Sequence, residues 1–324
     1  MRRIIKITVW LCVCAVVLGA VGARTAAVLR ETQTAAQVAP SEGRFVDTAQ
    51  GRIFVLEQGP ADGVPVLLAH GTGAWAGLWQ PVLEALAEKG YRAIAFDLPP
   101  FGFSDRDPGG DYHITTQAAR IAGLTRALEV RPVMVAHSFG AAPAMEAVLT
   151  DPAQYQAVVL VAAALGIGSH LAPKEVPLVL RPDWLRTIVV SATATNPLLT
   201  GTLLRQLIHV KSTATAEVVT VLQRPMTRSG STAAFAAWLP YLLRTPTDAR
   251  STRAAAYQAL DLPTGLIWGT EDTVTPLDQG QELQALLPDA GLITLADTGH
   301  IPQLERPEMF IAALLQALEA VVPR

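Results

Sequence analysis

The chain has 324 residues, of which half are hydrophobic and 16% are charged. This composition provides enough apolar material for one large core and excludes an intrinsically disordered protein. The net charge is −3, and no run of Lys and Arg with interleaved aromatic residues is present, so a nucleic-acid partner is not expected.

The N-terminal segment (1–23) has the pattern of a membrane-targeting sequence. Arg2, Arg3 and Lys6 precede an uncharged run of seventeen residues, Ile7–Ala23, which Arg24 ends. This pattern predicts a signal peptide or a membrane anchor. The apolar run is just long enough to span a membrane, and we favour the uncleaved anchor. Because basic residues stay in the cytoplasm, the rest of the chain is expected outside it, either membrane-anchored or, after cleavage, secreted or periplasmic.

The next segment, 24–43, has no sustained apolar stripe and is predicted to be a linker or a short helix leaving the membrane. The two cysteines of the chain, Cys12 and Cys14, both lie in the apolar run before it. Neither a disulfide framework nor a cysteine metal site is therefore expected in the body that begins near Arg44.

From Arg44 onward, short apolar runs alternate with segments of helical periodicity. The first two runs, 44–48 and 52–58, predict an antiparallel edge hairpin. The later strands are almost continuously apolar, which predicts an α/β fold with a mostly parallel sheet covered by helices on both faces. The later strands are predicted at 64–70, 92–98, 132–137, 157–164, 264–269 and 291–297, and helices at 77–89, 114–129, 139–150 and 307–321.

The alternation stops between 166 and 255, where seven prolines divide helix-forming residues into short pieces. This pattern predicts a helical lid (cap) inserted into a sheet domain made of 44–165 and 256–324. The lid carries ten Lys and Arg residues against four acidic residues, whereas the sheet domain carries ten against twenty-two. Such a basic insert favours an anionic substrate or a membrane surface.

The sequence Ala136-His137-Ser138-Phe139-Gly140 lies where a predicted strand ends and a helix begins. In this context a serine is held in a strained backbone conformation that exposes its hydroxyl group as a nucleophile. Small residues two positions before and after the serine let strand and helix approach. Ala136 and Gly140 meet this need, although glycine is commoner at both positions. The alternative role for Ser138 is that of a helix N-cap.

Two further polar residues follow other predicted strands. Asp272 stands just beyond the strand 264–269, and His300 follows the strand 291–297. Because the carboxyl ends of parallel strands lie side by side, Ser138 as nucleophile, His300 as general base and Asp272 as the orienting acid can converge at one edge. Their order along the chain is that of α/β hydrolases. Glu271 is the alternative acid.

The loop His70-Gly71-Thr72-Gly73 follows the first predicted parallel strand. A glycine-containing loop at this position can direct a backbone N–H at a developing oxyanion. We expect the N–H of Thr72 and that of Phe139 to form a two-donor oxyanion hole, the alternative being an ordinary glycine-rich turn.

These segments together resemble the α/β-hydrolase superfamily, specifically its lidded branch of esterases, proline iminopeptidases, haloperoxidase-like proteins and carbon–carbon bond hydrolases. The resemblance spans about 44–324 and includes HGTG (70–73), DLPPFGFSD (97–105), WGTEDTVTP (268–276) and GHIPQLERP (299–307). It implies that Asp272 rather than Glu271 is the acid. It also implies structural roles for four residues near the site, Asp97, Gly102, Ser104 and Glu305.

The resemblance implies a serine hydrolase that cleaves a carboxylic ester, or a related acyl bond, of a small and largely apolar substrate. No metal or organic cofactor is needed for this chemistry. A serine rather than an aspartate nucleophile argues against epoxide hydrolases and haloalkane dehalogenases. Trp184 and Trp238 of the lid are expected to contribute to an apolar acyl pocket.

Several alternatives remain open. Carbon–carbon bond hydrolysis, lactone opening and removal of N-terminal proline use the same fold. The last is disfavoured because paired lid carboxylates for a substrate amine are not evident among the four acidic residues of the lid. An alternative of another class is a non-catalytic ligand-binding protein on the same scaffold. The sequence predicts no oligomeric state.

Overall fold

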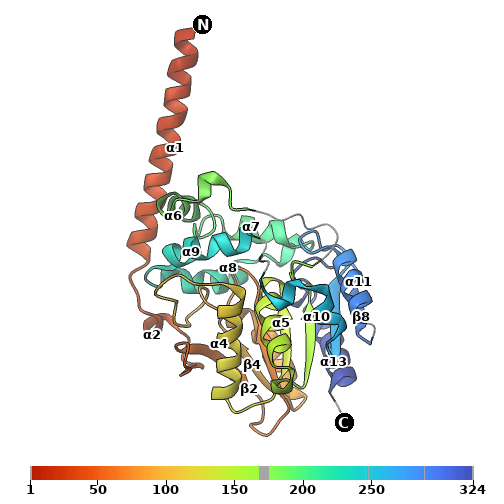
Figure 1. Ribbon diagram of the computed structural model, residues 1–324. Coiled ribbons are helices and arrows are strands. Elements are labelled where there is room, and N and C mark those ends of the chain that lie inside the picture. Colours follow the sequence, from red (N-terminus) through yellow and green to blue (C-terminus); the bar gives the residue numbers. More distant parts are fainter. Residues whose placement is uncertain (1, 168–174, 245, 247, 288, 323–324) are drawn as a thin grey trace.

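The computed structural model describes residues 2–167, 175–244, 246, 248–287 and 289–322 (Figure 1). Its centre is one sheet with the strand order β1-β2-β4-β3-β5-β6-β7-β8. The predicted edge hairpin is confirmed, because β1 (Gly43–Val46) pairs with β2 (Ile53–Gln58) in antiparallel orientation. β2 also pairs antiparallel with β4, and the other pairs are parallel. The parallel strands are β3 (Pro65–Ala69), β4 (Arg92–Phe96), β5 (Val133–His137), β6 (Ala157–Val161), β7 (Thr264–Gly269) and β8 (Gly291–Leu295).

Helices cover both faces of the sheet, as predicted. α3 (Gln80–Glu88) and α13 (Pro307–Val321) bury their apolar side chains against one face, and α4 (Ile114–Ala127), α5 (Ala141–Thr150) and α11 (Leu277–Leu286) against the other. Burial on both faces of the sheet explains why the sequences of the inner strands are continuously apolar. In β3, for example, successive side chains point to opposite faces, and each face is buried.

The residues between β6 and β7 include the segment 166–255, which we call the insertion. Its helices are α6 (Asp183–Ala192), α7 (Thr200–Leu207), α8 (Ala216–Gln223) and α9 (Ser231–Leu243), and its 3₁₀ turns are η4 (Leu178–Leu180), η5 (Lys211–Thr213), η6 (Arg224–Thr227) and η7 (Arg250–Thr252). They lie over the loops that follow the parallel strands (Figure 1). Leu204 of α7 packs on Ile301, and the Trp75 indole N–H donates to the Val221 carbonyl oxygen. α10 (Ala254–Gln258) then leads back into the sheet.

Pro240 departs from the expectation that prolines break the insertion into pieces, because it lies inside α9. A proline has no N–H to donate to the carbonyl oxygen four residues earlier, which is that of Ala236. This oxygen instead accepts a 3.0 Å hydrogen bond from Arg186 Nε of α6. An arginine of a neighbouring helix thus satisfies the acceptor that the proline leaves free, and the helix continues to Leu243.

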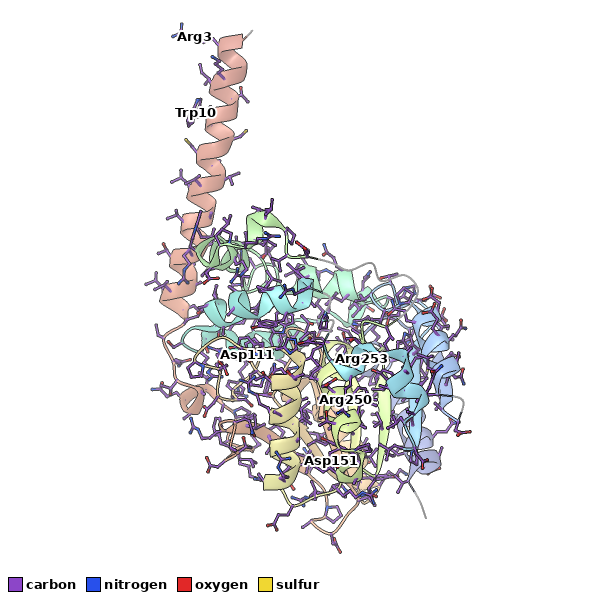
Figure 2. The ribbon with its side chains drawn as sticks, viewed as in Figure 1. Arg3, Trp10, Asp111, Asp151, Arg250 and Arg253 are labelled. Atoms are coloured by element: carbon purple, nitrogen blue, oxygen red, sulfur yellow. The ribbon has the colours of Figure 1, made fainter. Side chains whose placement is uncertain are left out.

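The N-terminal helix α1 (Arg2–Arg30) continues beyond the predicted anchor and into the predicted linker. Its N-terminal part stands free of the body, and Arg3 and Trp10 project from it (Figure 2). Its last turns pack against α6, and Ala27 is fully buried. Beyond α1, Glu31 accepts hydrogen bonds from the backbone N–H and the hydroxyl group of Thr232, and α2 (Ala35–Val38) contacts η6. The last turns of α1 and the residues after it are therefore part of the packed body.

Candidate active site

Ser138 stands at the turn between β5 and α5, in the 3₁₀ turn η2 (Ser138–Gly140). Its φ angle is +52°, a region that a non-glycine residue occupies at a cost of about 1–3 kcal/mol. Gly140 lets the turn close, because a Cβ atom there would stand 2.3 Å from the carbonyl oxygen of His70. The strained backbone predicted for Ser138 is therefore present in the structure.

The structure brings Ser138, His300 and Asp272 together. The hydroxyl oxygen of Ser138 lies 2.7 Å from Nε2 of His300, and Nδ1 of His300 lies 2.9 Å from Oδ2 of Asp272. All three residues are buried. Glu271, in contrast, is exposed and its carboxylate contacts the Thr270 hydroxyl group. Of the two candidate acids, Asp272 is therefore the one that contacts the imidazole.

The carboxylate of Asp272 is held by donors of its own loop. Its Oδ1 accepts hydrogen bonds from the backbone N–H groups of Val274 and Thr275, and its Oδ2 lies 2.8 Å from the Thr275 hydroxyl oxygen. Burial alone would raise the pKa of Asp272, but the hydrogen bond and charge of His300 and the two N–H donors outweigh it and lower the pKa below its usual value. The acid is thus kept ionised where it contacts His300.

His137 fixes the loop that carries His300. Its Nε2–H donates to the carbonyl oxygen of His300 at 2.8 Å, whereas its Nδ1 has no hydrogen-bond partner among the described residues. Burial, together with repulsion from His300, lowers the pKa of His137 to about 3. The side chain is therefore neutral at physiological pH and holds its neighbour through one directed bond.

The loop 70–73 runs beside the nucleophile. A Cβ atom at Gly71 would lie 2.9 Å from His137 Nδ1 and 3.0 Å from Ser138 Cβ, so glycine permits this close approach. His70 is buried with a pKa lowered to about 4 by burial, and its ring contacts the Gly71 carbonyl oxygen and accepts from the N–H of Leu98. Thr72 follows Gly71 directly, and Phe139 opens the turn after Ser138, so both expected oxyanion donors belong to segments that adjoin the serine.

The segment around Asp97 is a scaffold beneath this loop. Asp97 accepts from the N–H groups of Ala76 and Phe103, and its backbone oxygen accepts from the Ser104 hydroxyl group. Gly102 has a φ of +59°, and a Cβ there would collide with the Asp97 carboxylate. Burial raises the pKa of Asp97 to about 7, although its two N–H donors oppose the shift. These contacts are internal to the scaffold and involve none of the three converging side chains.

Glu305 is buried behind His300 and accepts four backbone hydrogen bonds. Two come from Gly299 and Ile301, on either side of the histidine, and two from His209 and Val210 of the insertion. The first pair corresponds to the structural role that the sequence suggested. The second pair was not predicted, and it ties the insertion to the loop that positions His300.

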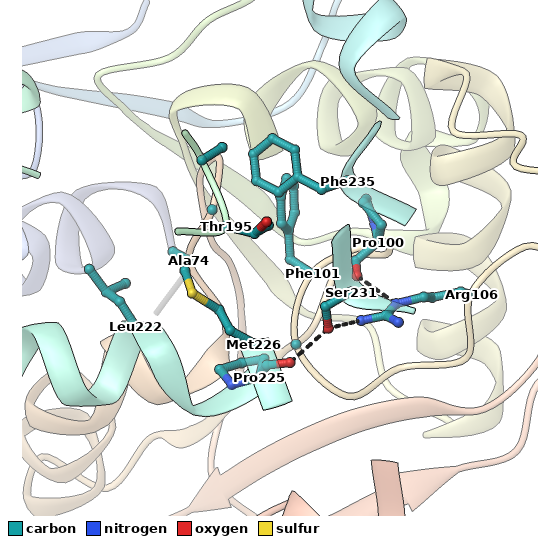
Figure 3. A pocket seen from close by; sticks show the side chains of 13 residues that line it. Ala74, Pro100, Phe101, Arg106, Thr195, Leu222, Pro225, Met226, Ser231 and Phe235 are labelled. Carbon is teal, nitrogen blue, oxygen red and sulfur yellow. Dashed lines mark hydrogen bonds between the residues drawn. The ribbon is translucent and has the colours of Figure 1, made fainter. Parts of the chain in front are cut away.

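A pocket lies between the loop 70–73, the segment 100–106 and the insertion (Figure 3). Its walls include Phe101, Phe235, Leu222 and Met226, and its free volume is about 60 Å³. At one side, Arg106 donates to the Pro100 carbonyl oxygen and to the Ser231 hydroxyl group. Ser138 and His300 lie outside the lining of this pocket, which is narrow in this conformation.

An aromatic cluster connects the turn of Ser138 with this pocket. The Trp238 ring contacts those of Phe139, Phe101 and Phe235 edge-on, with centroid distances of 4.9–5.2 Å. Neither tryptophan of the insertion lines this pocket, contrary to expectation: Trp184 is largely exposed on α6, and Trp238 is fully buried beside Phe101 and Phe235. Position within the insertion did not distinguish the two tryptophans, and Trp184 lies on the exposed side of α6, whereas Arg186 and Val190 of this helix are buried.

Two positioning residues were missed in the sequence. Thr275 belongs to the segment WGTEDTVTP, and His137 immediately precedes the serine. Each lies within three residues of a candidate site residue, Asp272 or Ser138, and this nearness in the sequence was the available signal. The directions of their side chains depend on loop geometry that sequence periodicity does not describe.

Comparisons with known proteins agree with this architecture. The family model described as the alpha/beta hydrolase fold matches residues 64–307. The "Uncharacterized hydrolase YugF" of Bacillus subtilis is 28% identical over 75% of this chain and 86% of its own length. "Haloalkane dehalogenase 2" of Mycobacterium tuberculosis is 26% identical, covering 86% and 96%. The "2-hydroxy-6-oxo-2,4-heptadienoate hydrolase" of Pseudomonas putida is 27% identical, covering 80% and 90%.

Among solved structures, a bacterial membrane phospholipase A superposes with a TM-score of 0.70 and 24% identity. The match covers 99% of both chains, so it extends over the N-terminal helix as well as the sheet domain. At this level of identity the likeness concerns the fold alone.

Proposed function

We propose that the chain, which belongs to the α/β-hydrolase fold family, is a serine hydrolase that cleaves a carboxylic ester or a related acyl bond. The observation that carries this proposal is the continuous hydrogen-bond chain from Ser138 through His300 to Asp272 at the ends of three strands. The positive φ of Ser138 supports it, because this strain is maintained where a hydroxyl group must be presented.

The proposed reaction proceeds through an acyl-enzyme. His300 Nε2 takes the hydroxyl proton while Ser138 Oγ attacks the substrate carbonyl carbon, and Asp272 stabilises the imidazolium and keeps Nδ1 protonated. The N–H groups of Thr72 and Phe139 donate to the oxyanion. His300 returns the proton to the leaving alcohol as the tetrahedral intermediate collapses. Water activated by His300 then hydrolyses the acyl-enzyme and restores the free serine.

The substrate class follows from the surroundings of the serine. The aromatic cluster and the apolar side chains of the neighbouring pocket favour a small or flexible acyl group over a charged one. Because the pocket holds only about 60 Å³, a longer acyl chain requires the insertion to move. In this proposal the insertion acts as a lid, and its ties to Glu305 connect its position to that of His300.

The decisive experiment uses the full chain in detergent, since residues 27–39 are part of the packed body. A fluorophosphonate probe should label the wild type and leave Ser138→Ala unlabelled, and p-nitrophenyl esters from acetate to dodecanoate should be hydrolysed only by the wild type. Turnover with a preferred chain length would support the esterase proposal. Equal labelling of the folded Ser138→Ala variant would refute the assignment of the nucleophile.

Carbon–carbon bond hydrolysis is the second candidate, favoured by the likeness to the heptadienoate hydrolase over most of both chains. The two activities separate with a 2-hydroxy-6-oxo-dienoate, whose conjugated absorption disappears on cleavage. Serine-dependent loss of this absorption, with p-nitrophenyl esters turned over far more slowly, would favour the second candidate. Haloalkane dehalogenation is disfavoured because Ser138 occupies the position where that reaction needs a carboxylate.

We also propose that α1 anchors the chain in a membrane, with the body outside the cytoplasm. The part Lys6–Arg30 is long and apolar enough to span, and an 18-residue window within it has a mean hydropathy of 2.1. Retention of the full chain in the membrane fraction after alkaline carbonate washing would support an anchor, and release into the soluble fraction would indicate a cleaved signal. Protease access to the body from the outer side tests its orientation.

A further inference from the structure

The body begins directly at the predicted membrane boundary. One face of α1, formed by residues 20, 23, 24, 27 and 30, is at least partly covered by the body, whereas the described side chains before residue 20 are exposed. The free part, 2–19, is about 27 Å long at 1.5 Å per residue, close to the thickness of a hydrocarbon core. The uncharged run nevertheless extends to Ala23. Its last turn thus lies both within the apolar run and beside the body.

The part of the body that meets this turn is α6, against which α1 packs. Beside it, η4 forms the upper edge of the insertion, at the point where α1 leaves the body (Figure 1). Here three large apolar side chains are unusually exposed, namely Leu178 (76%), Val179 (60%) and Trp184 (66%). We call these three residues the η4–α6 patch. Large apolar side chains exposed next to a predicted membrane helix are unfavourable in water and mark a surface that contacts another apolar phase.

The charges around the patch are balanced. Arg181 pairs with Glu175 at 2.9 Å, and Arg186 pairs with Asp183. The patch therefore brings no net charge into a low-dielectric region, and the arginine stems can extend along apolar surface with their heads in the headgroup layer. Tryptophan is the side chain enriched at the boundary between lipid and water.

We propose that the η4–α6 patch is a second membrane contact, which inserts into the interface of the same bilayer that α1 spans. The proposal rests on the membrane assignment of α1 given above but not on the chemistry of Ser138. Attachment through both α1 and the η4–α6 patch prevents the body from rotating about the axis of α1. The insertion then faces the membrane, and the sheet lies away from it. A lid held in this position receives acyl substrates directly from the bilayer, which narrows the proposed substrate class to membrane-resident esters.

A bilayer fits this surface better than a protein partner. The patch lies on and beside α6, which contacts α1, a helix long and apolar enough to span a membrane, and both lie on the same side of the insertion. It consists of three side chains on one 3₁₀ turn and the first turn of the following helix, a size typical of the interfacial contacts of peripheral domains.

Site-specific fluorescence tests the contact in the full chain reconstituted into phospholipid vesicles. The exposed cysteines Cys12 and Cys14 are replaced by alanine, and an environment-sensitive fluorophore is attached to Val179→Cys. Brominated lipid acyl chains should quench it strongly. The matched control is Met309→Cys, on the exposed surface of α13, which should remain unquenched. Trp10→Cys, on the free part of α1, serves as the positive control for spanning.

The outcomes separate the two proposals. Quenching at 10 and 179 but not at 309 supports the second contact. Quenching at 10 alone overturns it while leaving the anchor intact, and absence of quenching at all three positions overturns both. None of these results depends on enzymatic activity, so failure of the esterase proposal would leave this test valid.

Activity provides an independent measure. Replacing Leu178, Val179 and Trp184 together by serine should reduce hydrolysis of a fluorogenic ester embedded in vesicles by about tenfold. Hydrolysis of soluble p-nitrophenyl butyrate should be unchanged, since none of the three residues lines the pocket or contacts the triad. Met309→Ser should affect neither reaction. Equal activity of the triple variant and the wild type on embedded ester would contradict delivery from the bilayer.

Discussion

Replacing Thr275 by valine tests whether the orientation of the acid contributes to catalysis. The hydroxyl oxygen of Thr275 lies 2.8 Å from Asp272 Oδ2 and 3.0 Å from the Ala162 carbonyl oxygen. Valine keeps the shape and removes the hydroxyl group, while the backbone N–H bonds to Oδ1 remain. A hydrogen bond to a charged group contributes about 1.5–3 kcal/mol. If this energy serves to hold Asp272 against His300, kcat should fall by about 10–150-fold with KM nearly unchanged.

The assay is steady-state hydrolysis of p-nitrophenyl butyrate by the full chain in detergent. Thr275→Ser retains the hydroxyl group and should recover kcat to within a few-fold, which separates a lost hydrogen bond from a disturbed loop. Glu271→Gln, on the adjacent exposed residue, should leave kcat unchanged, whereas Asp272→Asn should lower it by about 10⁴-fold. A folded Thr275→Val variant with wild-type kcat would refute the argument that this hydroxyl group orients the acid.

Three other predictions concern ionisable side chains, two of them buried groups and the third the basic residues of the insertion. Between pH 6 and 5, unfolding should take up about 0.6–0.9 net protons, so the unfolding free energy falls by about 1 kcal/mol over this unit of acidification. His70 and His137 have folded pKa values of about 4 and about 3 and gain protons on unfolding, whereas Asp97, with a folded pKa of about 7, loses one. Urea denaturation midpoints across this range check the slope, which Asp97→Asn should roughly double, and a midpoint that rises on acidification would contradict the assignment. Glu31→Ala, which leaves the buried N–H of Thr232 without its acceptor and removes the ion pair with Arg30, should destabilise the full chain by about 1–3 kcal/mol in thermal melts, with the exposed Glu42→Ala as the control. If the basic insertion attracts substrate, kcat/KM should decline more steeply with added salt for esters with anionic leaving groups than for neutral ones, and equal declines would exclude this attraction.

The sheet was predictable because its sequence pattern is a direct consequence of burial. Inner strands covered on both faces must be apolar at every position, and each helix between them shows its own period. The edge hairpin was predicted from the same kind of pattern, whereas the order of the strands within the sheet was not predicted. Boundaries shifted by a few residues where a strand ends but the apolar run continues, as in β6, which ends at Val161 while the run extends to Ala164.

The three converging side chains were predictable for a different reason. Each follows a strand of a parallel sheet, and strand ends meet at one edge whatever the loop lengths. The choice between Glu271 and Asp272 did not follow from strand position. The loop turns so that one carboxylate points inward to two backbone N–H groups while the other faces water. The same dependence on loop geometry concealed Thr275.

The insertion was least predictable, because its packing depends on contacts between residues distant in sequence. Pro240 was expected to break a helix, but the oxygen that it leaves unpaired accepts from Arg186, fifty residues earlier. Likewise Glu31 stands in a stretch without an apolar stripe, yet it caps Thr232 of α9 and secures the end of α1 to the insertion. Both contacts involve α9, which also packs against α6. The end of α1 is thus in contact with α6 and, through Glu31, with α9, the helix that carries Phe235 at the wall of the pocket.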